Sequence, residues 1–345
     1  MKRVSDILNC VLDIAPLSRQ ESYDNSGLII GDLNNIVDKV LVALDVTEDV
    51  VDEAISKSCH FIISHHPFIF NGLKRINPSS SVGRIVIKAI KNDIAIAAMH
   101  TNLDNSSLGV SYCLATKLGL SDLHILRPVT GKMFKITVHC TDNIFEDMKK
   151  MLEDNHVSDE PKGQVFSYNA DNEYYMNKTL EVVVSEETAA VITSALKHFS
   201  SADFRYDMSP LCDRNENVGG GMVGLLGEAM EEKDFLAMVK ENLNATVLRH
   251  SAFLNKPVKK VALCGGSGFF MLTDAMSCNA DVYVTADVKY HDFFDADGRI
   301  LLVDAGHFET EQYAKDIIAD YIIKKNSNFA VLISEVNTNS INYFV

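Results

Sequence analysis

The chain has 345 residues, and its 32 Lys and Arg residues are outnumbered by 47 Asp and Glu residues, giving a formal net charge of −15. This length suggests two or three domains, and a hydrophobic content of 47% indicates a globular protein with a sizeable core. The acidic balance argues against nucleic acid or an anionic membrane as a partner, because both are bound through clustered Lys and Arg side chains.

Two further features concern the cellular location. No stretch approaches the roughly 18 uninterrupted apolar residues of a membrane span, and the N-terminus has helical spacing rather than a signal-peptide pattern. The seven cysteines are odd in number, scattered, and never arranged as C-x-x-C, which is the pattern of neither a disulfide framework nor a zinc ribbon. We therefore expect free thiols and a cytoplasmic protein.

The first 130 residues alternate between helical and strand patterns. Short apolar strands separated by helices require crossover connections, so they predict a largely parallel sheet. The expected elements, in chain order, are a helix at 4–14, a strand at 40–44, a helix at 48–57 with Thr47 as its N-cap, a strand at 61–63, a helix at 82–91, a strand at 94–99 and a helix at 107–118.

The pattern changes after Pro128, where strands are no longer wholly apolar and a polar, turn-rich run follows at 213–221. We expect an α+β domain at 131–214, inserted between two other parts at 1–130 and 215–345. Its expected elements are a strand at 134–139, a helix at 144–155, a strand at 180–184 and a helix at 186–199.

From residue 215 the alternation of helices and apolar strands resumes, so this last part is again expected to be α/β. Its expected elements are a helix at 233–243, a strand at 261–263, a helix at 269–278, strands at 281–285 and 300–303, a helix at 310–323 and a strand at 329–333.

The first and last parts resemble each other. Each contains a strand, a polar turn, a helix and a second strand that ends in Ser or Thr. Each also has a histidine at the end of a later strand with a carboxylate four residues on: His100 with Asp104, and His307 with Glu311. Two such matches in the same order predict a duplicated α/β unit, so the expected fold is two similar α/β lobes interrupted by the α+β insert.

The segment FIISHHPF indicates where the functional site lies. A buried strand places His65 and His66 at its carboxyl end, and Pro67 ends the strand. In open α/β sheets ligands bind beyond the carboxyl ends of strands, and neighbouring side chains on an extended backbone point to opposite sides. The pair could therefore serve two metal ions, or one metal and one substrate. The alternative is a pair of loop histidines that only form hydrogen bonds.

Two other strand ends favour the metal site. Asp104 lies past one of them, and His307 and Glu311 lie past the other, with a spacing that places both on one face of a helix. Imidazole combined with carboxylate suits Zn, Fe, Mn or Co better than Mg or Ca. We expect His65, His66, Asp104, His307 and Glu311 to bind two divalent ions, with a carboxylate between them.

Three residues near these motifs have two interpretations each. His100 and His291 are candidate catalytic residues, either as proton-transfer groups or as donors to a metal ligand, and each also fits a structural histidine. Asp45, at the end of its strand, either orients a metal ligand or has a turn or helix-capping role shared with Thr47.

Three polar or glycine-rich runs are also ambiguous. CGGSGFF at 264–270 fits either anion binding at a helix N-terminus or a tight turn from strand to helix. VGGGMVGLLGE at 218–228 has no P-loop lysine and is expected to be a hairpin or a close-packing element. DNSGLIIGD at 24–32 reads as a polar turn before a short strand, in a loop that could line a cleft.

Seven motifs occur in one order: DNSGLIIGD, ALDVTEDVVDEA, SHHPFIF, HTNLD, GGSGFF, DVYVTADVKYHD and DAGHFETE. Together they resemble the GTP cyclohydrolase I type 2 homologue family, also called the Ngg-interacting-factor-three-like family, over about 1–130 and 215–345. The resemblance implies a two-lobed subunit in a toroidal homohexamer, with a dinuclear metal centre held by the same five residues. For the middle part it implies the ferredoxin-like, PII-like insert of longer bacterial members.

Two functions are compatible with these features. The first is a metal-dependent hydrolase that activates water against a small-molecule substrate, and the family resemblance implies ring-opening hydrolysis of GTP. The sequence shows no evident Asn/Lys-x-x-Asp motif for reading guanine in a nucleotide-binding context. The alternative is a non-catalytic, toroidal metal-binding scaffold or regulator whose insert senses a ligand. A catalytic metal site keeps a coordination position open, whereas a closed site does not.

Overall fold

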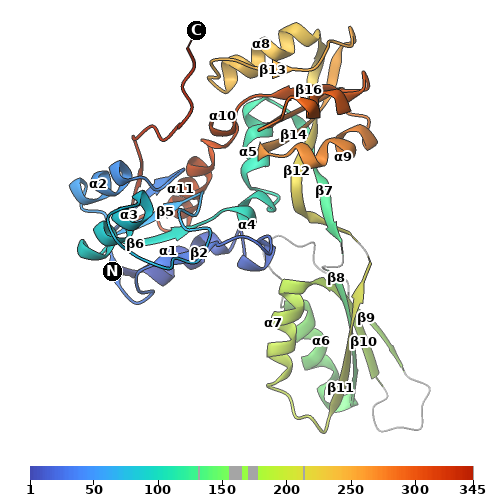
Figure 1. Cartoon of the computed structure of the whole chain (residues 1–345). Helices are drawn as coiled ribbons and strands as arrows, with labels where there is room; N and C mark the ends of the chain where they lie inside the picture. Colours follow the sequence, from blue (N-terminus) through green and yellow to red (C-terminus); the bar gives the residue numbers. More distant parts are fainter. Residues whose placement is uncertain (131–132, 155–164, 170–177, 213, 345) are drawn as a thin grey trace. The chain divides into compact units, whose positions relative to one another are not determined.

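The computed structural model describes residues 1–130, 133–154, 165–169, 178–212 and 214–344 (Figure 1). It is a mixed α/β protein with several sheets. The chain divides into two compact units: unit 1 consists of Met1–Arg127 and Gly219–Val345, and unit 2 of Pro128–Val218. Among the helices of the described ranges, none combines the length and the apolar character needed to cross a bilayer.

Unit 1 contains a five-stranded sheet in the order β17-β4-β5-β6-β2. Strands β17, β4, β5 and β6 are parallel, and β2 runs antiparallel to β6, so the prediction of a largely parallel sheet is confirmed here. The strands are β2 (Gly27–Ile30), β4 (Lys39–Ala43), β5 (Phe61–Ser64), β6 (Ala95–Ala98) and β17 (Ala330–Ile333). A separate two-stranded pair joins β1 (Lys2–Arg3) to β3 (Ile36–Val37).

Helices cover both faces of this sheet because side chains of β4 alternate between two apolar cores. Val40 and Val42 pack with α1 and α11, whereas Leu41 and Ala43 pack with α2 and α3. Thr47 caps α2 as predicted, since its Oγ1 accepts a hydrogen bond of 3.3 Å from Val50 N. The helices are α1 (Val4–Leu12), α2 (Glu48–Ser56), α3 (Ser81–Lys91) and α11 (Ala314–Lys325), and the 3-10 turn η1 spans Leu17–Arg19.

The second sheet of unit 1 has six strands in the order β13-β16-β15-β14-β12-β7. Strands β14, β15 and β16 are parallel, β12 runs antiparallel to β14, and β13 runs antiparallel to β16. The strands are β7 (Ser121–Thr130), β12 (Arg214–Met230), β13 (Arg249–His250), β14 (Val258–Ser267), β15 (Val282–Ala286) and β16 (Leu301–Asp304).

Helices and short 3-10 turns pack on this sheet or connect its strands. They are α5 (Val110–Lys117), α8 (Glu232–Asn242), η3 (Phe269–Met271), α9 (Leu272–Ser277), η4 (His291–Ala296) and α10 (His307–Glu311). Leu114 of α5 packs in the core of this six-stranded sheet, although α5 follows β6 of the five-stranded sheet in the sequence. Conversely, Ile318 of α11 packs in the core of the five-stranded sheet, although α11 follows β16 of the six-stranded sheet. Each core therefore contains segments from both ends of the sequence.

Within its described residues, unit 2 has a four-stranded antiparallel sheet in the order β11-β8-β10-β9 and two α-helices. Its core contains Ile136, Val138, Met148, Leu180 and Ile192. The β-α-β-β-α-β order of its elements is that of the ferredoxin-like motif. The elements are β8 (Met133–Cys140), η2 (Asp142–Ile144), α6 (Phe145–Asp154), β9 (Phe166–Asn169), β10 (Lys178–Ser185), α7 (Glu186–Leu196) and β11 (Phe204–Leu211).

The glycine-rich region before α8 differs in part from its prediction. Residues 214–230 form one long strand, β12, so the turn-rich run expected at 213–221 is wrong over its described residues, as is the hairpin alternative for 218–228. The close-packing alternative for 218–228 is confirmed. The glycines allow close backbone approach: a Cβ on Gly219 would lie 2.1 Å from Arg127 O of β7. Three boundaries of the predicted elements lie outside the described residues. They are residue 131, where the insert was expected to begin, residue 155, where a helix was expected to end, and residue 213, where the turn-rich run was expected to begin.

Candidate metal centre

Three parallel strands of the five-stranded sheet end at the same edge, and each is followed by a polar side chain. Asp45 follows β4, His65 and His66 follow β5, and His100 follows β6. The short helix α4 (Thr101–Asp104) comes directly after His100. The histidine pair is held by the backbone, since His65 N donates to Ala43 O at 3.2 Å and His66 N donates to Leu44 O at 2.9 Å.

The three parallel strands of the six-stranded sheet supply the opposite side of the site. β14 contains Gly265 and Gly266 near its end, β15 is followed by Asp287, and β16 is followed by α10. In α10, His307 Nε2 lies 2.8 Å from Glu311 Oε2, so the prediction that a helix places both side chains on one face is confirmed.

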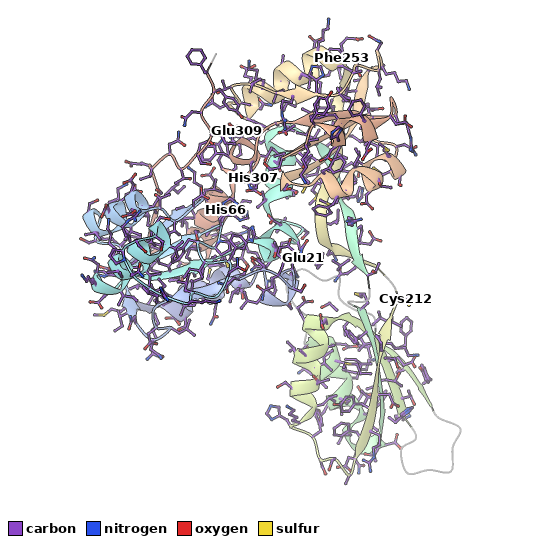
Figure 2. All side chains as sticks on the ribbon, viewed as in Figure 1. Glu21, His66, Cys212, Phe253, His307 and Glu309 are labelled. Atoms are coloured by element: carbon purple, nitrogen blue, oxygen red, sulfur yellow. The ribbon has the colours of Figure 1, made fainter. Side chains whose placement is uncertain are left out.

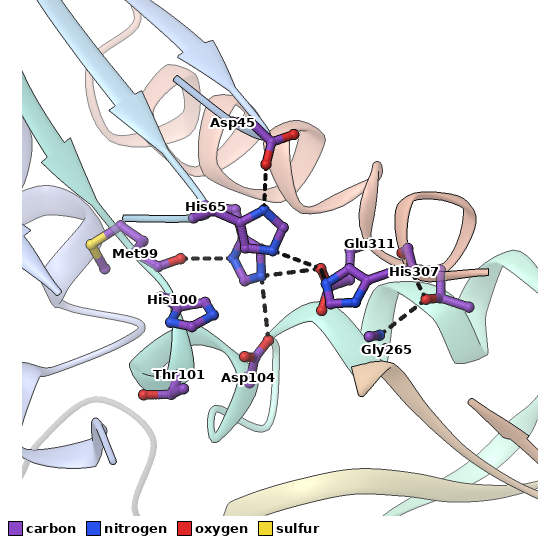
Figure 3. Close-up of polar contacts among 12 residues, drawn as sticks. Asp45, His65, Met99, His100, Thr101, Asp104, Gly265, His307 and Glu311 are labelled. Carbon is purple, nitrogen blue, oxygen red and sulfur yellow. Dashed lines mark hydrogen bonds and ion pairs between the residues drawn. The ribbon is translucent and has the colours of Figure 1, made fainter. Parts of the chain in front are cut away.

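The two groups of strand ends meet around the carboxylate of Glu311, which is 4% exposed. Its Oε2 lies 2.9 Å from His66 Nε2 and 3.8 Å from His65 Nε2. The rings of His66 and His307 have centroids 5.4 Å apart, although 241 positions separate them in the sequence (Figure 2). Asp104 approaches from α4, with its Oδ1 3.7 Å from His65 Nε2 (Figure 3).

Four histidines around this cluster share one arrangement: the Nδ1 atom of each is hydrogen-bonded to an oxygen atom. Because a carbonyl or a carboxylate accepts hydrogen bonds, each Nδ1 carries the proton and donates it. The four bonds run from His65 to Met99 O at 2.8 Å, from His66 to Asp45 Oδ1 at 2.7 Å, from His307 to Asp287 Oδ2 at 2.6 Å, and from His100 to Asp24 Oδ1 at 2.7 Å.

This arrangement matches that of metal-binding histidines, which typically donate one ring N–H to a carboxylate or a backbone carbonyl and bind the ion through the other nitrogen. Of the two interpretations of Asp45, its hydrogen bond to His66 supports the one in which it orients a candidate metal ligand. Asp24 and Asp287, the corresponding carboxylates for His100 and His307, were not singled out from the sequence. Asp287 directly follows a strand, so the same strand-end signal could have found it, whereas Asp24 lies in a loop.

The electrostatics of the cluster also fit bound cations. Burial lowers the pKa of His66, but its hydrogen bonds to Asp45 and Glu311 outweigh this effect and raise the pKa to about 9. The same opposing causes, with Asp287 in place of Asp45, raise the pKa of His307 to about 11. Burial raises the pKa of Glu311, but its histidine partners hold it well below its usual range. Without a metal, protons therefore balance the charge of the buried carboxylate.

Two of the buried side-chain atoms that lack a hydrogen-bond partner within the described residues belong to this cluster, His65 Nε2 and Asp104 Oδ1. A buried polar atom without a partner costs roughly 1–3 kcal/mol, so such atoms in a folded protein call for an explanation. Both face the cluster, and both are atoms that bind divalent metals. The residues present therefore fit a metal ion.

The potential ligand atoms form three groups, each with its atoms within 4.8 Å of one another. One group is His66, His307 and Glu311, and another is His65, Asp104 and Glu311. The third consists of His65, His66 and His100. The structure thus brings together the five ligands expected from the sequence, together with His100, which was a catalytic candidate.

His291, the other catalytic candidate, is not one of these six residues. It begins η4, is exposed, and contacts the rings of Tyr290 and Phe294, with centroid distances of 5.1 and 6.3 Å. It belongs to none of the three ligand groups found among the described residues.

The glycine run at 264–270 forms a tight connection beside the cluster. Gly266 N donates to Thr310 Oγ1 at 3.0 Å, and Gly268 N donates to Thr285 Oγ1 at 2.9 Å. A Cβ on Gly266 would lie only 2.0 Å from Glu311 Oε1. These contacts favour the tight-turn interpretation over anion binding, because side chains of the protein already occupy two of the N–H groups.

Comparisons with known proteins agree over nearly the whole chain. The family model described as Duf34/NIF3 (NGG1p interacting factor 3) matches residues 2–340. A Bacillus subtilis relative named GTP cyclohydrolase 1 type 2 homolog is 33% identical, covering 96% of each chain. A Halalkalibacterium halodurans relative with the same name is 33% identical, covering 94% of each chain.

Solved structures show the same fold. A Bacillus cereus protein related to NIF3 superposes with a TM-score of 0.85 at 33% identity, covering 100% of this chain and 99% of its own. The Staphylococcus aureus protein SA1388 superposes with a TM-score of 0.83 at 29% identity, covering 99% of both chains.

Proposed function

Because this chain belongs to the Duf34/NIF3 family, we propose that it is a hydrolase that depends on a dinuclear metal centre. The observation that carries this proposal is the cluster at the strand ends, where imidazole Nε2 atoms converge on the buried carboxylate of Glu311. The other ring nitrogen of each imidazole, Nδ1, is hydrogen-bonded to an oxygen that orients the ring.

Two of the ligand groups support a count of two ions. The group of His66 and His307 and the group of His65 and Asp104 have only Glu311 in common. A carboxylate that belongs to both groups can lie between two ions, as in two-metal sites. The nitrogen and oxygen ligands suit Zn, Fe, Mn or Co.

When bound, such ions lower the pKa of a water molecule and polarise a carbonyl, imine or phosphoryl group of the substrate. The protein's own side chains supply the remaining chemistry. Asp45 and Asp287 keep His66 and His307 in the tautomer whose Nε2 can bind a cation. His100 lies beside the cluster with its Nδ1 on Asp24, so its Nε2 is in position to accept and return a proton during hydrolysis. His291 is a second, exposed candidate for proton transfer.

The substrate that the relatives' name suggests is GTP, which is opened by hydrolysis of its purine ring. The direct test loads metal-free protein separately with Zn, Mn, Fe or Co and measures formate release and ring-opened product from GTP. The same preparations are then tested against a panel of small hydrolysable metabolites. We expect turnover that depends on the metal and is lost in His100→Ala, whereas His124→Ala, an exposed histidine bonded to Asp122, keeps it.

A non-catalytic role is the alternative. Protein with full metal content that hydrolyses neither GTP nor any member of the panel would support a metal-binding scaffold or regulator instead. The same experiment therefore separates the two functions, because metal content and turnover are measured on one preparation.

We further propose that the chain forms a toroidal homohexamer of two-lobed subunits in the cytoplasm, with unit 2 as a PII-like insert. The element order of unit 2 is compatible with such an insert, and the seven cysteines are all free thiols, which suits a reducing compartment. Analytical ultracentrifugation tests the assembly: the expected mass is six times that of the 38.2 kDa chain, and a monomer would contradict it.

A further inference from the structure

Asp24 is a buried carboxylate that does not belong to the ligand cluster. Its side chain is 0% exposed. Its Oδ1 accepts hydrogen bonds from His100 Nδ1 at 2.7 Å and from Asn25 N at 2.7 Å. Its Oδ2 accepts from Thr101 N at 3.0 Å, from Thr101 Oγ1 at 2.5 Å and from Ser26 Oγ at 2.9 Å. Five donors thus surround one carboxylate, and only one of them is an ionisable side chain.

The bond to His100 determines the tautomer of that ring. Oδ1 already accepts the backbone N–H of Asn25, and an ionised carboxylate has no proton to donate, so the Nδ1 of His100 must carry the proton. The Nε2 of neutral His100 is then an acceptor. His100 forms a potential ligand group with His65 and His66, whose rings have centroids 5.4 and 5.5 Å from that of His100.

His100 is also held on its other side. The ring of Phe70 meets it edge-on, with centroids 5.5 Å apart and an interplanar angle of 84°. The backbone of His100 is bound as well, since its N–H donates to Ser26 Oγ at 3.3 Å. These contacts restrict the position of the ring, and Asp24 is the partner that is hydrogen-bonded to a ring nitrogen and so selects the tautomer.

We propose that Asp24 is a positioning residue that holds His100 in the Nδ1–H tautomer, so that its Nε2 faces the metal cluster as an acceptor. The effect of this tautomer on turnover rests on the proposed hydrolase function, in which His100 is expected to exchange a proton with the reacting groups. The tautomer itself is independent of any reaction.

A second role of Asp24 has to be separated from the first. Through Thr101, the same carboxylate fastens the loop at 19–26 to the beginning of α4, which carries Asp104. Loss of Asp24 could therefore act through the fold alone. Thr101→Val is the matched control, since it removes the hydroxyl bond to Oδ2, together with the bond that Glu21 N donates to the same hydroxyl at 2.9 Å, and leaves the bond between Oδ1 and His100 Nδ1 intact.

The test is nitrogen-15 NMR of the histidine side chains in full-length protein loaded with zinc alone, without substrate. His100→Gln identifies the His100 signals. In the natural protein and in Thr101→Val we expect His100 to show a protonated Nδ1 and an unprotonated Nε2. In Asp24→Ala we expect the fixed tautomer to be lost, with zinc content unchanged.

If turnover is found, Asp24→Ala is expected to lower kcat by about 10²-fold or more with little change in KM, as for other groups that orient a catalytic histidine. A natural protein whose His100 is protonated on Nε2 would overturn the proposal, even if Asp24→Ala does not fold. An Asp24→Ala variant that keeps the Nδ1–H tautomer would also overturn it. Absence of turnover in the natural protein would count against the hydrolase function alone, because the tautomer is measured without substrate.

Discussion

Glu311 holds the candidate centre together at the scale of single residues. Its Oε2 lies within 3 Å of His66 Nε2 and His307 Nε2, which come from different sheets of unit 1. The Glu311 carboxylate fits at this position because the neighbouring residue, Gly266, has no side chain. Gly266 has a φ of +60°, and a Cβ there would lie 2.0 Å from Glu311 Oε1.

Gly266→Ala is therefore expected to displace Glu311 and reduce the amount of bound metal. Gly298→Ala is the matched control: Gly298 has a φ of +62°, but a Cβ there would meet nothing within 4 Å. Both variants carry the cost of a positive φ, about 1–2 kcal/mol of folding free energy. Metal analysis and thermal unfolding of the two should show similar destabilisation from this cause, with metal loss only in Gly266→Ala. Equal metal content would contradict the proposed role of Glu311.

Much of the site could be predicted from the residues at strand ends. His65, His66, Asp104, His307 and Glu311 all follow buried strands, and parallel strands bring their carboxyl ends to one edge. The partners of the histidines were harder to predict. Asp24 precedes a strand that is antiparallel to its neighbour, and only tertiary packing carries it to His100, 76 positions away.

At the scale of elements, the C-terminal segment after β17 contributes to the site. Thr338 Oγ1 lies 2.5 Å from Asp45 Oδ2, and the other oxygen of that carboxylate holds His66 Nδ1. The next residue, Asn339, donates to Glu309 Oε1 at 3.3 Å. The hydroxyl of Thr338 therefore helps to fix the carboxylate that orients a candidate metal ligand.

Thr338→Val is expected to weaken metal binding by about tenfold, because loss of a partner to an orienting group typically costs 10- to 100-fold in affinity. Thr338→Ser keeps the hydroxyl and should bind metal like the natural protein. Competition with a chromophoric chelator measures both affinities. If valine and serine give the same value, the contact with Asp45 has no part in metal binding.

The sequence left two interpretations open for the glycine-rich run at 218–228, a hairpin or a close-packing element. The structure supports close packing, because the run lies within the long strand β12. Its glycines serve close approach to β7 rather than a reversal of the chain. Strands β9 and β11 of unit 2 were not predicted. β11 is an edge strand with mostly exposed residues, so it lacks the apolar run that marks a buried strand.

At the scale of the whole molecule, the net charge is −15. Two of the carboxylates that contribute to it, Asp104 and Glu311, belong to the groups that could bind a metal cation. In the metal-free protein, His66 and His307 have pKa values raised to about 9 and about 11, so both are protonated at neutral pH. A metal ion can bind Nε2 only after that proton leaves.

Metal loading near pH 7 is therefore expected to release protons, and the apparent affinity should rise as the pH increases from 6 towards 9. The sign follows from the raised pKa values, because acid favours the protonated, metal-free form. Isothermal titration calorimetry in buffers of different ionisation enthalpy measures the number of protons released. A binding enthalpy that does not depend on the buffer would show that these histidines are not ligands.

The central claim is a pair of divalent ions held by His65, His66, Asp104, His307 and Glu311, with Glu311 between them. Anomalous X-ray diffraction from crystals of zinc-loaded protein, recorded on both sides of the zinc absorption edge, tests this most directly. We expect two anomalous peaks, one on each side of the Glu311 carboxylate, next to His66 and His307 and next to His65 and Asp104. A single peak, or peaks away from Glu311 despite full zinc content, would contradict the account.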